Sequence, residues 1–248
     1  IKSIYFAGNA NYSNSELRSL IMTKESKWFR FLETNDTYDP DRIEYDKHLL
    51  SKFYNSVGFA DFSVISVTAD LLPTKEGFIL TYSIEEGDKY QFGDISINNK
   101  LTNVQTSEVE KFISQKKGET FNLGLMESIS EKISDYLGAH GYPQVEVYPD
   151  IKTNRGEKVV DVVIVVDQAD KIFINKINIE GNLKTEDHVI RRQLKIAEGD
   201  IYNRTKIEKG EQNIRNLDYF DKLLLKIAPT SKRDRYDINI DVEEKSTS

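Results

Sequence analysis

One short pattern of large apolar residues occurs three times along the chain and constrains the fold more than any other feature. In each copy, Tyr or Phe is followed by apolar residues five, twelve and fifteen positions later. The copies are Tyr38, Ile43, Leu50 and Phe53; Phe121, Met126, Ile133 and Tyr136; and Tyr202, Ile207, Ile214 and Leu217. A period of roughly 80 residues is longer than that of common solenoids. It suits a small domain used in tandem.

Each copy lies between strand-like segments. A short alternating stretch precedes it at 4–6, 95–97 and 177–179, and an apolar run closed by acidic residues follows at 78–86, 159–167 and 236–244. Helices with one apolar side must cover one face of a sheet. The sequence therefore predicts an α+β fold of tandem β-α-α-β-β modules, each with a three-stranded mixed sheet covered on one face by two helices. The predicted module boundaries are 1–88, 89–170 and 171–248.

Local signals support this element order. Ser13 and Glu16 have the spacing of a capping box at the start of a helix. The run 159–166 is apolar at nearly every position, which indicates a strand covered on both faces, with a neighbouring module as a candidate cover. The acidic pairs Glu85-Glu86 and Glu243-Glu244 at strand ends are interpreted as solvated turns.

The second and third strands of each module can form a hairpin. If the first strand pairs with the third, the other hairpin strand becomes an edge whose free N–H and C=O groups can template an incoming strand. In the first module this candidate edge consists of Phe62, Ser63, Val64, Ile65, Ser66 and Val67. An ordinary solvated edge is the alternative, and the sequence leaves both open.

Composition narrows the class of protein. With 38% hydrophobic and 30% charged residues, the chain is typical of soluble globular domains. Its net charge of -7 argues against nucleic-acid binding. No apolar run approaches the ~18 residues of a membrane helix. The chain has no cysteine, which excludes disulfides and thiolate metal sites. Because the first residues look like a strand, we expect a fragment of a longer protein.

The sequence offers no constellation for chemistry. His48, His140 and His188 fall in different modules, without a second His at metal-ligand spacing, and are expected at the surface or at helix ends. Phosphate-binding glycine loops and a Gly-x-Ser-x-Gly elbow are missing from the sequence. We therefore expect no enzymatic activity, no cofactor and no metal site.

An insertion of about eight residues distinguishes the first copy from the other two. It lies within 24–35 and includes Trp28, Phe29 and Phe31. Aromatic residues are frequent anchors of protein interfaces. Two interpretations stay open: these side chains pack on their own domain, or they form a docking loop.

Several motifs carry a family resemblance that spans essentially the whole chain. The helix end at 53–60, the link at 84–90 and the first-strand exit at 177–182 resemble polypeptide-transport-associated (POTRA) domains. The insertion around Trp28 is similar to that of the third of five such modules in outer-membrane protein assembly factors. The run Glu243-Glu244-Lys245 resembles the segment before their β-barrel. The resemblance thus implies modules three to five. The runs 98–100 and 217–220 depart from the family pattern.

The resemblance implies a non-enzymatic function at the periplasmic face of the bacterial outer membrane. Such modules receive unfolded outer-membrane proteins, by the hypothesis of β-augmentation at the 62–67 edge, and dock assembly-complex lipoproteins. It also implies a C-terminal β-barrel in the same full-length chain. The lipoprotein site is carried over to the first helix of the last module and the turn after it, at Arg191, Arg192, Lys195 and Glu198.

A second reading comes from another class of protein. In this runner-up reading, the chain is a POTRA-type structural or docking module of a divisome or secretion or translocation protein, with no role in client folding. The sequence that follows Ser248 in the full-length protein would discriminate the two readings.

Overall fold

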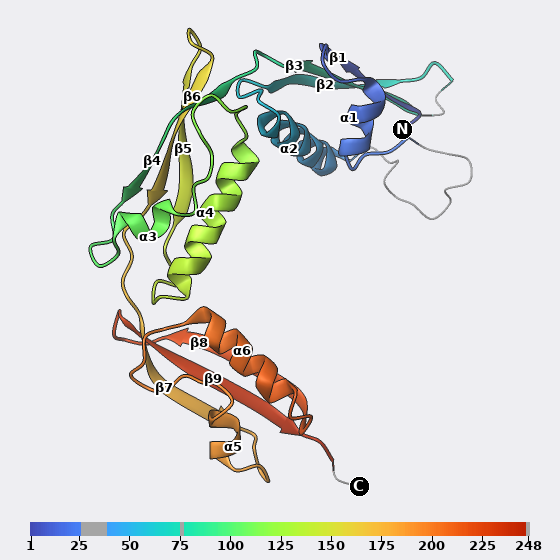
Figure 1. The fold of residues 1–248 in the computed structure, drawn as a ribbon. Helices are drawn as coiled ribbons and strands as arrows, with labels where there is room; N and C mark the ends of the chain where they lie inside the picture. The colour runs from blue at the N-terminus through green and yellow to red at the C-terminus, as the bar shows by residue number, and fades with distance from the viewer. Residues whose placement is uncertain (26–38, 75–76, 247–248) are drawn as a thin grey trace. The chain divides into compact units, whose positions relative to one another are not determined.

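The chain folds as β-α-α-β-β repeated three times, which confirms the predicted fold class (Figure 1). The first module contains β1 (Ser3–Ala7), α1 (Asn14–Leu20), α2 (Pro40–Ser56), β2 (Ser63–Leu71) and β3 (Phe78–Glu85). The second contains β4 (Gln91–Asn99), α3 (Thr106–Glu110), α4 (Leu123–Gly138), β5 (Val147–Asn154) and β6 (Val159–Val166). The third contains β7 (Phe173–Glu180), α5 (Asp187–Arg191), α6 (Arg204–Arg215), β8 (Phe220–Pro229) and β9 (Arg235–Glu244).

This computed structural model describes residues 1–25, 39–74 and 77–246. It contains two compact units, one of Ile1–Ser96, Ser114–Ser128 and Pro149–Val163, the other of Ile97–Ile113, Ile129–Tyr148 and Ile164–Ser248. The first module lies in the first unit and the third module in the second, so each is described by itself. No helix in the described ranges is both long and apolar enough to cross a bilayer.

The three sheets share one strand order, β1-β3-β2, β4-β6-β5 and β7-β9-β8. In the first sheet, β1 runs parallel to β3 and β2 antiparallel to it. The third sheet repeats this arrangement with β7, β9 and β8. The last strand of each module is therefore central, and its hairpin partner is an edge, as the sequence predicts.

Local sequence signals start the two helices of the first module. The N–H of Ser13 donates to Oε2 of Glu16 at 2.8 Å and the N–H of Glu16 donates to the Ser13 hydroxyl at 3.3 Å, which confirms the capping box. Asp39 accepts a hydrogen bond from the N–H of Asp41 at 3.1 Å, and Pro40 occupies the first turn of α2. At the N-termini of α1 and α2, these side chains thereby satisfy backbone donors that a helix leaves unpaired.

The buried stripe of the long helices differs by one position from the predicted pattern. Phe53 and Tyr136, the last members of two copies, are only half-buried, whereas the neighbouring Tyr54 and Leu137 are fully buried. At ~100° per residue, a position eleven residues after the second member, Ile43 or Met126, returns to within about 20° of it, and a position ten residues after it lies about 80° away. Helical geometry therefore selects Tyr54 and Leu137.

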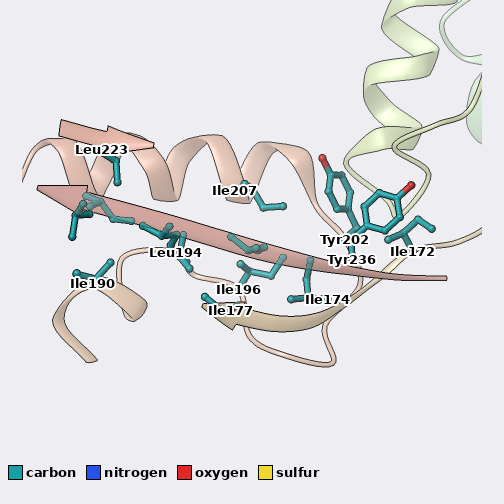
Figure 2. Packing of buried hydrophobic residues seen from close by; sticks show 14 residues of the cluster. Ile172, Ile174, Ile177, Ile190, Leu194, Ile196, Tyr202, Ile207, Leu223 and Tyr236 are labelled. Atoms are coloured by element: carbon teal, nitrogen blue, oxygen red, sulfur yellow. The ribbon is translucent and has the colours of Figure 1, made fainter. Parts of the chain in front are cut away.

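The core of the third module is aliphatic with two tyrosines at one end (Figure 2). Ile190 and Leu194 from α5 and the following turn, and Ile207 from α6, pack against the inward side of β7 and β9. The buried members of this cluster are Ile172, Ile174, Ile177, Ile190, Leu194, Ile196, Tyr202, Ile207, Ile214, Leu223, Tyr236, Ile238, Ile240 and Val242. One covered sheet face thus accounts for the core of this module.

The central strand of the second module only partly meets its prediction. Val160, Val162 and Ile164 of β6 are fully buried. Val159 and Val163, at the alternate positions, are half-buried. The apolar run at 159–166 therefore has one well-covered face and one face with partial cover.

A glycine with positive φ follows the first strand in the first and third modules. Gly8 has φ +91° and Gly181 has φ +87°. A Cβ atom at Gly8 would lie 2.0 Å from the carbonyl oxygen of Ile84, and one at Gly181 would lie 1.9 Å from that of Val242. The first strand can therefore leave the sheet against the end of the last strand only because no side chain is present there.

Candidate functional site

Among the residues that the structure describes, β3 is the only strand that pairs with β2, so β2 is an edge of the first sheet. Five of the six predicted edge residues, 63–67, lie in β2, and Phe62 lies just before it and is buried. Ile65 is 63% exposed and Leu71 is 53% exposed. Val64, Val67 and Ala69 pack partly against the core, so the strand is anchored on one face.

A β-bulge interrupts this edge inside the predicted segment. The register between β2 and β3 shifts between Val64 and Ser66, which leaves Ile65 as the extra residue. Bulges twist an edge strand locally and discourage strand addition there. From Val67 to Leu71 the register is regular. The part of β2 that can template another strand therefore extends further toward the hairpin turn than the sequence predicts.

The opposite edge of the first sheet is closed by side chains. The N–H of Ile4 donates to Oε1 of Glu25 at 2.9 Å, and the N–H of Phe6 donates to Oδ1 of Asn14 at 2.9 Å. Arg18 Nη1 lies 2.8 Å from the same Glu25 oxygen. The carboxylate takes the place that a neighbouring strand's carbonyl would take, so β1 offers no free donor at these two residues.

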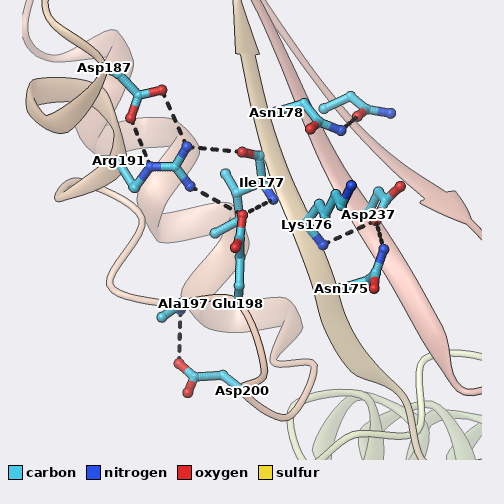
Figure 3. Close-up of polar contacts among 11 residues, drawn as sticks. Asn175, Lys176, Ile177, Asn178, Asp187, Arg191, Ala197, Glu198, Asp200 and Asp237 are labelled. Atoms are coloured by element: carbon cyan, nitrogen blue, oxygen red, sulfur yellow. Dashed lines mark hydrogen bonds and ion pairs between the residues drawn. The ribbon is translucent and has the colours of Figure 1, made fainter.

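The third module repeats this arrangement at β7 (Figure 3). The N–H of Ile177 donates to Oε1 of Glu198 at 2.9 Å, and Arg191 Nη2 donates to the carbonyl of Ile177 at 3.0 Å. Arg191 Nη1 lies 3.5 Å from Glu198 Oε1. We call Arg18–Glu25 and Arg191–Glu198 the edge clamps. Each covers the first-strand edge of its own module.

The predicted lipoprotein-docking residues only partly come together. Arg191, Arg192 and Lys195 line a shallow depression of about 440 Å³. Glu198 instead turns toward β7 in its edge clamp. Arg191 is also held by Asp187, with Nε 2.8 Å from Oδ1, and this hydrogen bond lowers the pKa of the Asp187 carboxyl. Arg192 and Lys195 are therefore the more available cations of the set.

The predicted docking loop is not part of this geometry. Trp28, Phe29 and Phe31 lie outside the described residues, so the two interpretations of the insertion stay as the sequence leaves them.

Glu86 contradicts the solvated-turn interpretation. Its side chain is buried and accepts hydrogen bonds from the Tyr54 hydroxyl at 2.8 Å and from Asn11 Nδ2 at 2.6 Å. The N–H of Asn11 donates to the same carboxylate. Burial raises the pKa of Glu86, but these hydrogen bonds outweigh it, so its pKa lies below the usual value. Glu86 thus holds the loop after β1.

Glu244 holds the loop after the first strand of the third module in the same way. Its carboxylate accepts hydrogen bonds from the N–H groups of Lys184 at 2.9 Å and Thr185 at 2.6 Å. Gln168 occupies the matching position of the second module. Glu86 and Glu244 are therefore structural anchors of loops, whereas Glu85 and Glu243 are exposed, as the solvated-turn interpretation expects.

The histidines lie as the sequence predicts, since His48, His140 and His188 are all exposed. Within the described part of the chain, no group of His, Asp or Glu side chains is arranged to hold a metal ion. The candidate binding sites considered below are therefore the strand edges and the depression beside α5.

Sequence reasoning missed the edge clamps and a buried carboxylate, Asp46. Asp46 is fully buried in α2, where the other modules have Ile129 and Gly210. It accepts hydrogen bonds from the N–H of Met22 at 2.7 Å and the Tyr82 hydroxyl at 3.0 Å. Alignment of the copies would have revealed both features, because a charged residue at an apolar repeat position needs partners.

Two proteins with similar sequences share a name. A protein of Neorickettsia risticii (strain Illinois), named outer membrane protein assembly factor BamA, is 29% identical over 91% of this chain and 30% of its own length. A protein of the same name from Neisseria meningitidis serogroup B is 28% identical over 100% of this chain and 31% of its own length. The chain thus spans about a third of these relatives.

Solved structures agree with the fold. The crystal structure of Haemophilus influenzae BamA POTRA3-5 has a TM-score of 0.75 at 22% identity and covers 98% of this chain and 96% of its own. BamA from Haemophilus ducreyi lacking POTRA domains 1-3 has a TM-score of 0.56 at 23% identity, over 64% of this chain and 30% of its own. The predicted resemblance to BamA POTRA domains is confirmed.

The family comparison covers nearly every residue. The family described as POTRA, surface antigen variable number repeat, matches residues 1–87, 90–169 and 172–245. These matches coincide with the three copies of the apolar pattern and with the three sheets. The chain therefore belongs to the POTRA family.

Proposed function

We propose that this chain is a periplasmic, non-enzymatic part of an outer-membrane protein assembly machine. Its relatives are named outer membrane protein assembly factors, and its family and fold agree with theirs. In this proposal the modules receive unfolded outer-membrane proteins at the periplasmic face of the outer membrane. The open β2 edge is the observation that carries the proposal, because the opposite edge of the same sheet is closed.

Main-chain pairing suits such a receptor. A strand added to β2 would bind through backbone N–H and C=O groups, which every client sequence possesses. The exposed side chains of Ile65 and Leu71 offer apolar contact at the two ends of the edge. Recognition of this kind tolerates many sequences, as a receptor for diverse extended chains requires.

Site-specific photocrosslinking tests the β2 edge. We expect a crosslinker at Leu71 to capture an unfolded outer-membrane protein at least several-fold more than one at Tyr5, although Tyr5 is 49% exposed. Tyr5 is the matched control because it lies on β1, whose outer donors are occupied. A second control at Tyr45 of α2, also 49% exposed, reports nonspecific capture. Equal capture at all three positions would contradict the proposal.

Lipoprotein docking beside α5 is the second part of the proposal. Arg192 and Lys195 present available cationic side chains in the depression, which favours a partner with an acidic surface. Replacing Arg192 and Lys195 by glutamate should reduce pull-down of an assembly lipoprotein by about tenfold or more, because like charges then face each other. Lys226→Glu, an exposed residue of β8, is the control for charge alone. Unchanged pull-down by the double variant would rule out this site.

A further inference from the structure

The loop before α1 fills a hollow of the first module with a tyrosine ring. Tyr12 lies directly before Ser13, the N-cap of α1, and packs against the core of its module. Its ring centroid is 4.9 Å from that of Phe53, 5.4 Å from that of Tyr54 and 6.4 Å from that of Phe59, and all three pairs meet edge to face. The end of α2 thus forms a hollow for one aromatic side chain, which the module itself supplies.

The second module has a valine where the first has Tyr12. Asn99 Nδ2 donates to the carbonyl of Val104 at 2.8 Å, as Asn9 Nδ2 donates to that of Tyr12 at 2.8 Å. Val104 also lies directly before Gln105, the N-cap of α3. The two positions are therefore equivalent. Valine carries no ring, so Val104 leaves the place of the tyrosine ring open.

The aromatic walls of the hollow are nevertheless present in the second module. The N–H of Tyr142 donates to the carbonyl of Leu137 at 3.0 Å, as the N–H of Phe59 donates to that of Tyr54 at 3.0 Å. Tyr142 therefore takes the place of Phe59, and Tyr136, directly before Leu137, adds a second ring. The second module keeps the walls of the hollow without the ring that lies between them in the first.

A cavity of about 610 Å³ lies at this place. Its lining includes Val104, Tyr136 and Tyr142 from the second module, and Lys171 and Tyr202 further along the chain. These residues all belong to the second compact unit. Figure 2 shows Tyr202 at one end of the core of the third module. The volume is within the range of ligand pockets, which leaves room for a side chain together with its flanking backbone.

The charges around the cavity favour an uncharged occupant. Lys171 and Lys206 line it together with Glu108 and Asp200, so positive and negative side chains are equal in number. An acidic occupant would meet the two carboxylates, and a basic one would meet the two ammonium groups. A phenol hydroxyl can donate to a carboxylate and accept from an ammonium group. Tyrosine therefore combines the ring that the walls fit with the polarity of the lining.

We propose that this cavity binds a tyrosine side chain of another polypeptide, in the place that Tyr12 fills in the first module. The guest ring would pack against Tyr136 and Tyr142, because aromatic rings attract one another in edge-to-face arrangements. Buried aromatic side chains of this kind are frequent anchors of protein interfaces. The inference goes beyond the proposed function, which rests on β2 of the first module, so either can fail alone.

A neutral peptide with one tyrosine tests the cavity. The probe is Ser-Gly-Ser-Tyr-Ser-Gly-Ser, acetylated and amidated at its ends, titrated into the whole chain and followed by NMR. We expect shifts at the amides of Val104, His140 and Tyr142, and nuclear Overhauser contacts from the peptide ring to the methyl groups of Val104. Val104→Tyr should weaken binding by about tenfold or more, because the chain then fills the cavity itself.

Matched controls separate the cavity from the loop and from charge. Val104→Thr should bind like the parent chain, because it keeps a small side chain; the third module has Thr185 at this position, where Asn182 Nδ2 donates to its carbonyl at 2.9 Å. The peptide with alanine, glutamate or lysine in place of tyrosine should bind several-fold more weakly. The converse variant Tyr12→Val should bring new peptide shifts to Phe59.

Three results would overturn the proposal. The first is equal binding by the parent chain and Val104→Tyr. The second is a parent complex without contacts from the peptide ring to the Val104 methyl groups, which decides the matter even if Val104→Tyr fails to fold. The third is concentration-dependent shifts at the same residues without peptide, because the occupant would then be a second copy of this chain.

Discussion

Replacing Gly181 by alanine is expected to destabilise the third module by about 4 kcal/mol. The new Cβ would lie 1.9 Å from the carbonyl oxygen of Val242, and φ at this position is +87°. The obstructing atom belongs to the backbone of the central strand, so β7 and β9 must separate locally. Urea unfolding followed by the methyl signals of Ile238 and Ile240, both fully buried, measures the loss.

Gly199→Ala is the matched control for backbone conformation. Gly199 has φ +88°, yet a Cβ there would meet nothing within 4 Å. It should therefore cost only about 1–2 kcal/mol, the usual penalty for a left-handed alanine. If the two variants were equally stable, the close approach of Gly181 to Val242 would not be what constrains this turn.

Replacing Asp46 by alanine is expected to destabilise the first module by about 3–5 kcal/mol. The substitution leaves the N–H of Thr23 and the hydroxyl of Tyr82 buried without their acceptor, and it also removes the acceptor of the Met22 N–H. Asp46→Asn keeps one acceptor oxygen and should cost less. The measurement is urea unfolding monitored at the buried methyl groups of Leu50 and Leu80.

Asp41→Ala on the same helix provides the comparison. Asp41 is exposed in the first turn of α2, so its removal should cost well under 1 kcal/mol. Suppose that Asp46→Ala lowered the free energy of unfolding by as little as Asp41→Ala does. The buried network around Tyr82 would then not stabilise the module.

The repeat pattern predicts the element order and the strand pairing because these follow from burial alone. One apolar stripe on each long helix requires one covered sheet face, and a hairpin beside a parallel first strand leaves β2 at the edge. The capping box at Ser13 is equally local and is equally well predicted. Interactions between residues close in sequence, or repeated in every module, are therefore within reach of sequence reasoning.

The Glu86 anchor was beyond that reasoning because it joins residues far apart in sequence. Glu86 appears at a strand end like any solvated acid, and only the fold brings Asn11 and Tyr54 to it. The bulge at Ile65 is similar, since nothing in the segment 62–67 itself marks the register shift. Polar contacts of this kind depend on which residues the fold brings together, so the periodicity of the sequence cannot predict them.

Differences among the copies explain more about partners than the shared pattern does. Arg18 and Arg191 belong to edge clamps that close β1 and β7, and Val104 leaves open the hollow that Tyr12 fills in the first module. Closed first-strand edges also protect tandem modules from pairing with one another. The proposed function therefore places binding of extended segments at the β2 edge, which no edge clamp covers among the described residues.

Amide hydrogen exchange in the presence of a short alternating valine–threonine peptide tests this selectivity most directly. The account predicts that Ile4 and Ile177 already exchange slowly without peptide, because their N–H groups donate to Glu25 and Glu198. It predicts new protection on peptide addition in β2 from Val67 to Leu71. New protection at Ile4 and Ile177, with none in β2, would contradict it.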